Sequence, residues 1–170
     1  GLAIFCNDST FKDIDVSNNN AGTDGGAIWV IGHNSLFDNV TSDNNTASRG
    51  GSSYVEGENS TFIDCTLSSN QAIYNASIAE SGSGGAVYVV GNNSLFDNVT
   101  SVDNTAVRGG SSYIAGDNTT VINCDLDNNI ATDCGGGLEV KGVDCLFENI
   151  TLSNCHADND GGAIYVVGDD

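Results

Sequence analysis

The chain has 170 residues, of which 22 are glycine and none is proline or methionine, unlike an average globular protein. It has 23 acidic and 4 basic residues, for a net charge of −19. This charge excludes nucleic acid as a partner, because binding to phosphates needs a basic patch, and it argues against anionic membranes. No apolar run approaches the roughly 20 residues that cross a bilayer.

An internal repeat organises the chain. Residues 25–54 read GGAIWVIGHNSLFDNVTSDNNTASRGGSSY, and residues 84–113 read GGAVYVVGNNSLFDNVTSVDNTAVRGGSSY. Within these units, Gly-Gly pairs recur about every 25 residues, which is typical of a solenoid. The pairs begin at Gly25, Gly50, Gly84, Gly109, Gly135 and Gly161.

The spacing also predicts the domain organisation. The third rung is longer than the others, so we expect a loop insertion at about 73–83. No linker or composition shift divides residues 1–170, which predicts one solenoid unit. Because the chain opens on Gly1 rather than on methionine, we expect it to be a fragment of a longer repeat protein.

Each rung is predicted to hold three short strands. The segments AIWVI (27–31) and AVYVV (86–90) are rich in β-branched and aromatic residues and are bounded by glycine. A second strand such as SLFDN (35–39) follows a turn, and a third such as DCTLS (64–68) comes next. No segment has the apolar stripe of a helix. The pattern predicts an all-β fold, a parallel β-helix of about six rungs.

Stacking the rungs aligns like residues in columns. The inward column of the first strand is Val30, Val55, Val89, Ile114, Val140 and Val166. The second strand contributes Phe11, Phe37, Phe62, Phe96, Val121 and Phe147. We expect these columns to form the core. A polar column of Asn19, Asn45, Asn70, Asn104 and Asn129 is interpreted as a structural ladder that ends or adapts at Cys155.

Several motifs resemble known surface proteins. The segments GGAI (25–28), GGAV (84–87) and NNTA (44–47), with the GxN turns, are similar to the repeats of large adhesin-like cell-surface proteins of methanogenic archaea. More distantly they resemble the GGAI repeats of chlamydial polymorphic membrane proteins. The FxxN motif of that family is absent, because Phe37 is followed by Asp38 and Asn39.

The resemblance implies a right-handed, pectin-lyase-like parallel β-helix at the extracellular cell surface, and adhesion as its function. It supplies no binding residues.

The candidate binding residues are aromatic side chains on the first strand. Alternation places one column outward, with Glu139 in the sixth rung and Ala3 in the first. The aromatic members are Trp29, Tyr54, Tyr88, Tyr113 and Tyr165. Such rings could stack on sugars or anchor a protein. The alternative, which the sequence leaves open, is that they only stabilise neighbouring strands.

Catalysis is not expected. The outward acids Glu56 and Glu139 lie three rungs apart, about 14 Å by the strand spacing, which is too far for glycoside hydrolysis. Lys141 is the only basic residue expected on that face. No metal-binding residues are predicted, although turns rich in Asp and Asn could supply oxygen ligands to Ca²⁺, the only cofactor considered.

Arginines and cysteines give further expectations. Arg49 and Arg108 are placed to form edge ion pairs with Asp24 and Asp133, respectively. Cys65 and Cys124 are expected in the core. If any disulfide forms, Cys134 with Cys155 is the favoured pair.

The favoured function is a non-catalytic, adhesin-like rod that attaches cells to one another or to a host through its outward first-strand face. Its partner would be a glycan or a surface protein of another cell. The alternatives are a structural stalk or filament subunit, and a carbohydrate-active β-helix enzyme. Exposed strand edges at the ends predict either a longer rod or end-to-end or edgewise self-assembly.

Overall fold

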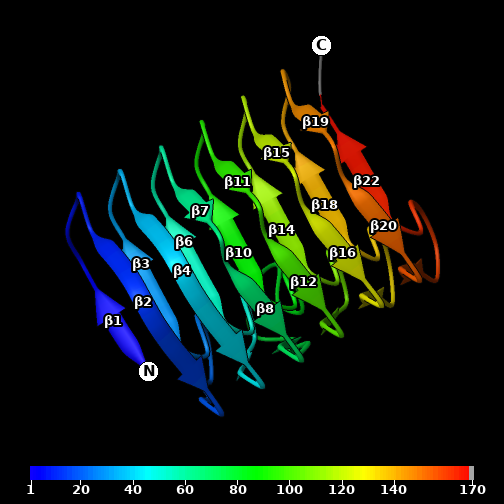
Figure 1. Cartoon of the computed structure of the whole chain (residues 1–170). Helices are drawn as coiled ribbons and strands as arrows, with labels where there is room; N and C mark the ends of the chain where they lie inside the picture. The colour runs from blue at the N-terminus through cyan, green and yellow to red at the C-terminus, as the bar shows by residue number, and fades with distance from the viewer. Residues whose placement is uncertain (169–170) are drawn as a thin grey trace.

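Short strands, separated by turns at residues with positive φ, wind the chain into a parallel β-helix. The structure is a computed structural model, which describes residues 1–168. Figure 1 shows the rungs stacked side by side from the N-terminal to the C-terminal end. The described residues contain no helix, and therefore none that is long and apolar enough to cross a membrane. The predicted fold class is confirmed.

The strands form three parallel sheets. The first sheet holds β1 (Leu2–Ile4), β3 (Ile28–Ile31), β6 (Ser53–Glu56), β10 (Val87–Val90), β14 (Ser112–Ala115), β18 (Leu138–Lys141) and β22 (Ile164–Val167). The second holds β2 (Thr10–Ser17), β4 (Leu36–Asp43), β7 (Thr61–Ile63), β8 (Thr66–Ser68), β11 (Leu95–Asp97), β12 (Thr100–Val102), β15 (Thr120–Ile122), β16 (Asp125–Asp127), β19 (Leu146–Glu148) and β20 (Thr151–Ser153). The third holds β5 (Thr46–Ala47), β9 (Gln71–Ala72), β13 (Thr105–Ala106), β17 (Ile130–Ala131) and β21 (His156–Ala157).

This arrangement refines the predicted rung. The second and third predicted strands of a rung belong to one sheet, and in β2 and β4 they run together as one strand. The third sheet consists of two-residue strands that the sequence pattern did not indicate.

Left-handed residues turn the chain at the corners of each rung. Most are Asn or Asp, which adopt positive φ more readily than other non-glycine residues. They form three columns, which include Asp8, Asn34 and Asn59; Asp13, Asn39 and Asp64; and Asn18, Asn44 and Ser69. The fourth corner is the first glycine of each Gly-Gly pair, with φ of +66° at Gly84, for example. Regular Asx and Gly spacing therefore sets the shape of the rung.

The predicted apolar columns form the core. Val30, Val55 and Val89 are fully buried, and the phenylalanines stack with ring centroids 4.4 to 4.7 Å apart from Phe11 to Phe96. Val166, in the last strand, is 46% exposed. Each rung packs on its neighbours, as expected for a repeat protein whose core is a one-dimensional stack.

The predicted asparagine ladder is also confirmed. Each side-chain amide donates to the carbonyl oxygen of the next asparagine at 3.0–3.1 Å, from Asn19 to Asn129. Its members from Asn45 onward are 0% exposed, so the hydrogen bonds run inside the rod. Cys155 continues the column after Asn129, with 4.0 Å from Asn129 Nδ2 to Cys155 Sγ.

The cysteines are all free. Cys65 and Cys124 are buried core residues, as predicted. The favoured pair of Cys134 and Cys155 is not formed. Cys155 Sγ lies in the asparagine column, 3.4 Å from the Leu126 carbonyl oxygen, whereas Cys134 Sγ contacts Asp133.

Candidate binding face

The outer face of the first sheet carries the aromatic column. The strand register aligns Trp29 with Tyr54, Tyr54 with Tyr88, and Tyr88 with Tyr113. Glu139 and Tyr165 follow in the same column. The alignment is as predicted, and Tyr54, Tyr88 and Tyr113, here called the tyrosine stack, form an apolar cluster separate from the core.

The expected exposure of this column is wrong. Tyr54, Tyr88 and Tyr113 are only 5%, 1% and 0% exposed, and Trp29 and Tyr165 are half-buried. Part of the burial comes from the rings themselves, which stack with centroids 5.2 and 4.8 Å apart. Alternation along a strand shows which face a side chain takes, but it does not show what covers that face.

Basic side chains cover part of the tyrosine stack. The Arg49 guanidinium lies 4.8 Å from the Tyr54 ring centroid, and the Arg108 guanidinium lies 5.2 Å from that of Tyr113. These distances permit cation–π attraction. Lys141 Nζ also lies on this face, 5.1 Å from the Tyr113 ring centroid. The sequence predicted Lys141 as the only basic residue here, and the presence of Arg49 and Arg108 shows that this prediction is wrong.

The two predicted arginine ion pairs have different outcomes. Arg49 donates to both carboxylate oxygens of Asp24, at 2.6 and 2.9 Å, which confirms the first pair. Arg108 forms no ion pair with Asp133 and rests on the Tyr113 ring. An arginine near the end of a rung can reach either an acidic residue on the adjacent rung or the face of an aromatic ring.

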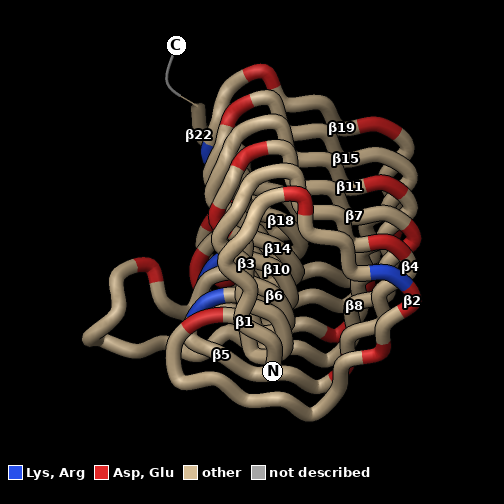
Figure 2. Tube along the Cα trace, turned by 90° about the vertical axis from the view of Figure 1, so that its left-hand side faces the viewer, with Lys and Arg blue, Asp and Glu red and all other residues tan. Residues whose placement is uncertain are grey.

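The insertion (residues 73–83) also covers part of the tyrosine stack. Figure 2 shows it as a loop that extends away from the stacked rungs. Its Glu80 carboxylate accepts hydrogen bonds from the phenols of Tyr88 and Tyr113, the latter at 3.2 Å. The end of the insertion rejoins the rod at Ser83, which forms β-bridges to Arg49 and Arg108. Glu80 thus fastens the loop to the tyrosine stack.

Two carboxylates surround one ammonium group at this point. Lys141 Nζ lies 3.9 Å from Glu80 and 3.6 Å from Glu139. Glu139 is 2% exposed, and its Oε2 has no hydrogen-bond partner. Sequence reasoning missed Glu80 because it lies in an insertion with no periodicity.

The environments of the two carboxylates move their pKa values in opposite directions. Burial raises the pKa of Glu139, and the charges of Arg108 and Lys141 offset this only in part. Burial also acts to raise the pKa of Glu80, but the hydrogen bonds from Tyr88 and Tyr113, with Lys141 and Arg108, outweigh it and lower that pKa. Burial raises the pKa of Tyr54 to about 12, so this phenol is neutral at ordinary pH.

These shifts predict opposite effects of neutralising each acid. A lowered folded pKa means that ionised Glu80 stabilises the fold above its unfolded pKa, and that this contribution is lost as the pH falls through the folded value. A raised folded pKa means that Glu139 favours the fold when protonated and loses this contribution as the pH rises. At pH 7 we expect Glu80→Gln to speed backbone amide hydrogen exchange in residues 73–83. We expect Glu139→Gln to leave the melting temperature of the chain unchanged or to raise it. Equal loosening by both variants would contradict this assignment.

The described residues contain no group of three or more His, Cys, Asp and Glu side chains placed to hold a metal ion. The two histidines of the chain, His33 and His156, lie in different rungs. His33 Nδ1 accepts the Glu58 backbone N–H at 3.1 Å, and His156 pairs with the exposed Asp158.

The fold defines a β-solenoid repeat protein. Within it, residues 13–31 match the model of the Chlamydia polymorphic membrane protein repeat, the more distant of the two resemblances. The matched stretch covers about three quarters of one turn, from the third predicted strand position through Gly25 and Gly26 to the end of β3. Comparisons with curated proteins and with solved structures gave no match.

Proposed function

We propose that the chain is part of a non-catalytic, adhesin-like rod at the extracellular cell surface, which attaches a cell to another cell or to a host. The contact is made by the insertion that is fastened to the first-strand face. The repeat match to a bacterial membrane-protein family and the similarity of GGAI and NNTA to archaeal adhesin-like repeats support the surface location.

One observation carries this proposal: the insertion is held in a defined position. Glu80 binds two members of the tyrosine stack, and Ser81, 5% exposed, donates to the Asn75 carbonyl oxygen at 2.8 Å. Recognition residues are often found on loops that a rigid scaffold positions. A stalk or filament subunit, the second candidate, would gain only stability from this contact and has no use for a positioned loop.

An enzymatic role has less support. Glu80 and Glu139 bring two carboxylates near one ammonium, and opposed pKa shifts are typical of an acid and base pair. However, Glu139 is almost fully buried beneath its neighbours, so a polymeric substrate could not reach it. We therefore assign this cluster to fastening the insertion.

The test is attachment of beads coated with the chain to a panel of archaeal, bacterial and animal cells. A matched variant replaces residues 71–82 with the ThrAlaVal found at 105–107 in another rung, where Thr105 pairs with Gln71 and Arg108 pairs with Ser83, so that the rung returns to the ordinary length. Melting curves would establish that the variant is folded. We expect the parent to attach to at least one cell type and the variant to lose most of that attachment.

Two results would contradict the proposal. Attachment by neither protein would favour the stalk. Equal attachment by both would move the contact away from the insertion, to faces such as that of the half-buried Trp29 and Tyr165.

A further inference from the structure

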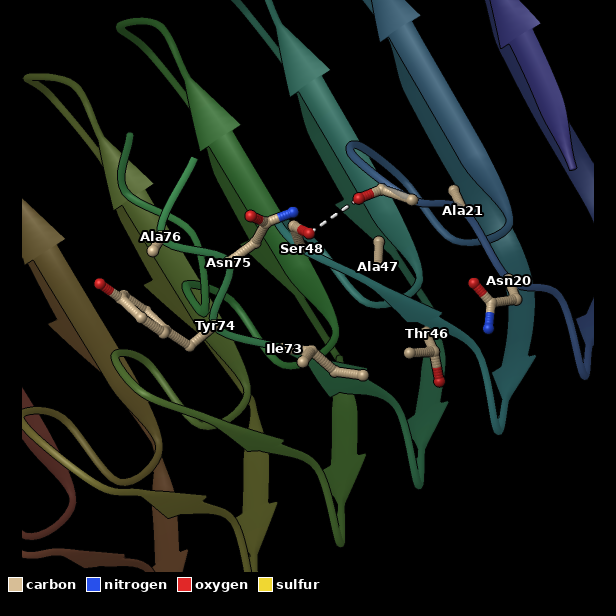
Figure 3. Close-up of a pocket in the computed structure, with 10 residues that line it drawn as sticks. Asn20, Ala21, Thr46, Ala47, Ser48, Ile73, Tyr74, Asn75 and Ala76 are labelled. Atoms are coloured by element: carbon tan, nitrogen blue, oxygen red, sulfur yellow. Dashed lines mark hydrogen bonds between the residues drawn. The ribbon is translucent and has the colours of Figure 1, made fainter. Parts of the chain in front are cut away.

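The first residues of the insertion expose a large apolar surface. Ile73 is 48% and Tyr74 is 67% exposed. They border a groove of about 430 Å³ that crosses the third sheet at β5. Figure 3 shows Tyr74 and Ile73 at one side of this groove and Asn20 and Ala21 at the other, with Ala47 between them.

A second groove lies on the other side of the same two residues. It has a volume of about 340 Å³ and is lined by Gln71, Ile73, Tyr74, Thr105 and Ile130, among others. Tyr74 therefore separates two neighbouring grooves and contributes to both. A ligand longer than one groove could extend across the tyrosine.

The chemistry of the grooves indicates an uncharged ligand. No residue that lines either groove is charged, on a chain whose net charge is −19. The first groove offers the amides of Asn20 and Asn75 and the hydroxyl of Thr46, whereas the buried Ser48 hydroxyl donates to the Gly22 carbonyl oxygen at 2.8 Å. Its remaining residues are small or apolar. A few polar groups among apolar residues, beside an exposed aromatic ring, suit a ligand that has both hydroxyls and an apolar face.

Tyr74 is also held in place before any ligand binds. On one side of it, the Ile73 backbone N–H donates to the Ala47 carbonyl oxygen at 2.8 Å. On the other, the Asn75 backbone N–H donates to Ser81 Oγ at 2.9 Å. A ring carried on a backbone that is held at both flanks loses less conformational freedom on binding than a ring on a free loop.

We propose that these two grooves and Tyr74 form a binding site for an uncharged oligosaccharide, one sugar of which stacks on the Tyr74 ring. Sugar rings combine an apolar face of C–H groups with a rim of hydroxyls, which matches the ring and the neutral amides and hydroxyls around it. The inference rests on the proposed function, for which it names the ligand class and places the contact at the start of the insertion.

The test is binding of the chain to an array of immobilised neutral oligosaccharides, namely glucans, mannans, galactans and chitin fragments, beside oligogalacturonates and sialylated glycans. Tyr74→Ala is compared with Tyr74→Trp, which keeps an aromatic ring, and with Leu146→Ala, which removes another side chain that is 50% exposed, on β19. We expect binding to at least one neutral oligosaccharide, more than tenfold weaker in Tyr74→Ala. Tyr74→Trp and Leu146→Ala should bind within about threefold of the parent.

Failure to bind any neutral oligosaccharide, preference for the charged ones, or full binding by Tyr74→Ala would each overturn this inference. The bead assay separates such a failure from failure of the proposed function. If beads attach only when the insertion is present but Tyr74→Ala attaches normally, the rod is still an adhesin, and its contact is made by other residues of the insertion.

Discussion

Replacing Asn104 with alanine is expected to lower the free energy of unfolding by about 3 to 5 kcal/mol. The side chain is 0% exposed and sits in the middle of the asparagine ladder. Its oxygen accepts the Asn70 backbone N–H at 2.8 Å, and its amide donates to the Leu67 carbonyl oxygen at 2.9 Å. Alanine would leave the Asn70 N–H buried without a partner, at a cost of about 1 to 3 kcal/mol, and would remove the buried side-chain hydrogen bonds to Leu67 and Asn129, each worth about 1 kcal/mol. Urea unfolding followed by circular dichroism measures the effect.

Asn98→Gly is the matched control. Asn98 belongs to an exposed column and donates to Asp64 Oδ1 at 2.6 Å. Its φ of +55° is one that glycine adopts freely, so the substitution removes the side-chain hydrogen bond without straining the turn. We expect a loss below about 1 kcal/mol. If Asn104→Ala costs no more than this control, the buried ladder does not stabilise the rod as described.

Repetition made much of this fold predictable. A single rung does not show which of its residues are buried. Six aligned rungs show which positions stay apolar, so core columns such as Val30, Val55 and Val89 could be predicted from the spacing. The ladder from Asn19 to Asn129 was predictable for the same reason, including its change at Cys155. Like residues at like places are what a one-dimensional stack requires.

The candidate site was less predictable because its decisive residues do not repeat. Alternation placed Tyr88 and Tyr113 on the outer face, but it could not show that Arg49, Arg108 and Glu80 would cover them. Arginine has a long side chain whose reach is not fixed by its position in the rung. Glu80 and Tyr74 belong to an insertion that occurs once, so no column of equivalent residues indicates where their side chains lie.

The Gly-Gly motif leads to the second large prediction. Its two glycines serve different purposes. The first, such as Gly84, has a φ of +66°, which side chains rarely adopt. The second, such as Gly85, has no positive φ, but a Cβ added there would lie 1.9 Å from the Gly110 carbonyl oxygen of the next rung and 2.8 Å from that of Thr105.

Gly85→Ala is therefore expected to lower the free energy of unfolding by about 3 kcal/mol or more, because both obstructing atoms belong to the backbone and rungs must separate to make room. In thermal unfolding this corresponds to a decrease of about 6 to 12 °C for a chain of this size. The control is Gly162→Ala, at the same motif position in the last rung, where an added Cβ meets no atom within 4 Å. It should change stability by less than about 0.5 kcal/mol. A large loss at both positions would mean that the second glycine is needed for the conformation of its own rung. A large loss at Gly85 alone would mean that it is needed for close approach of the next rung.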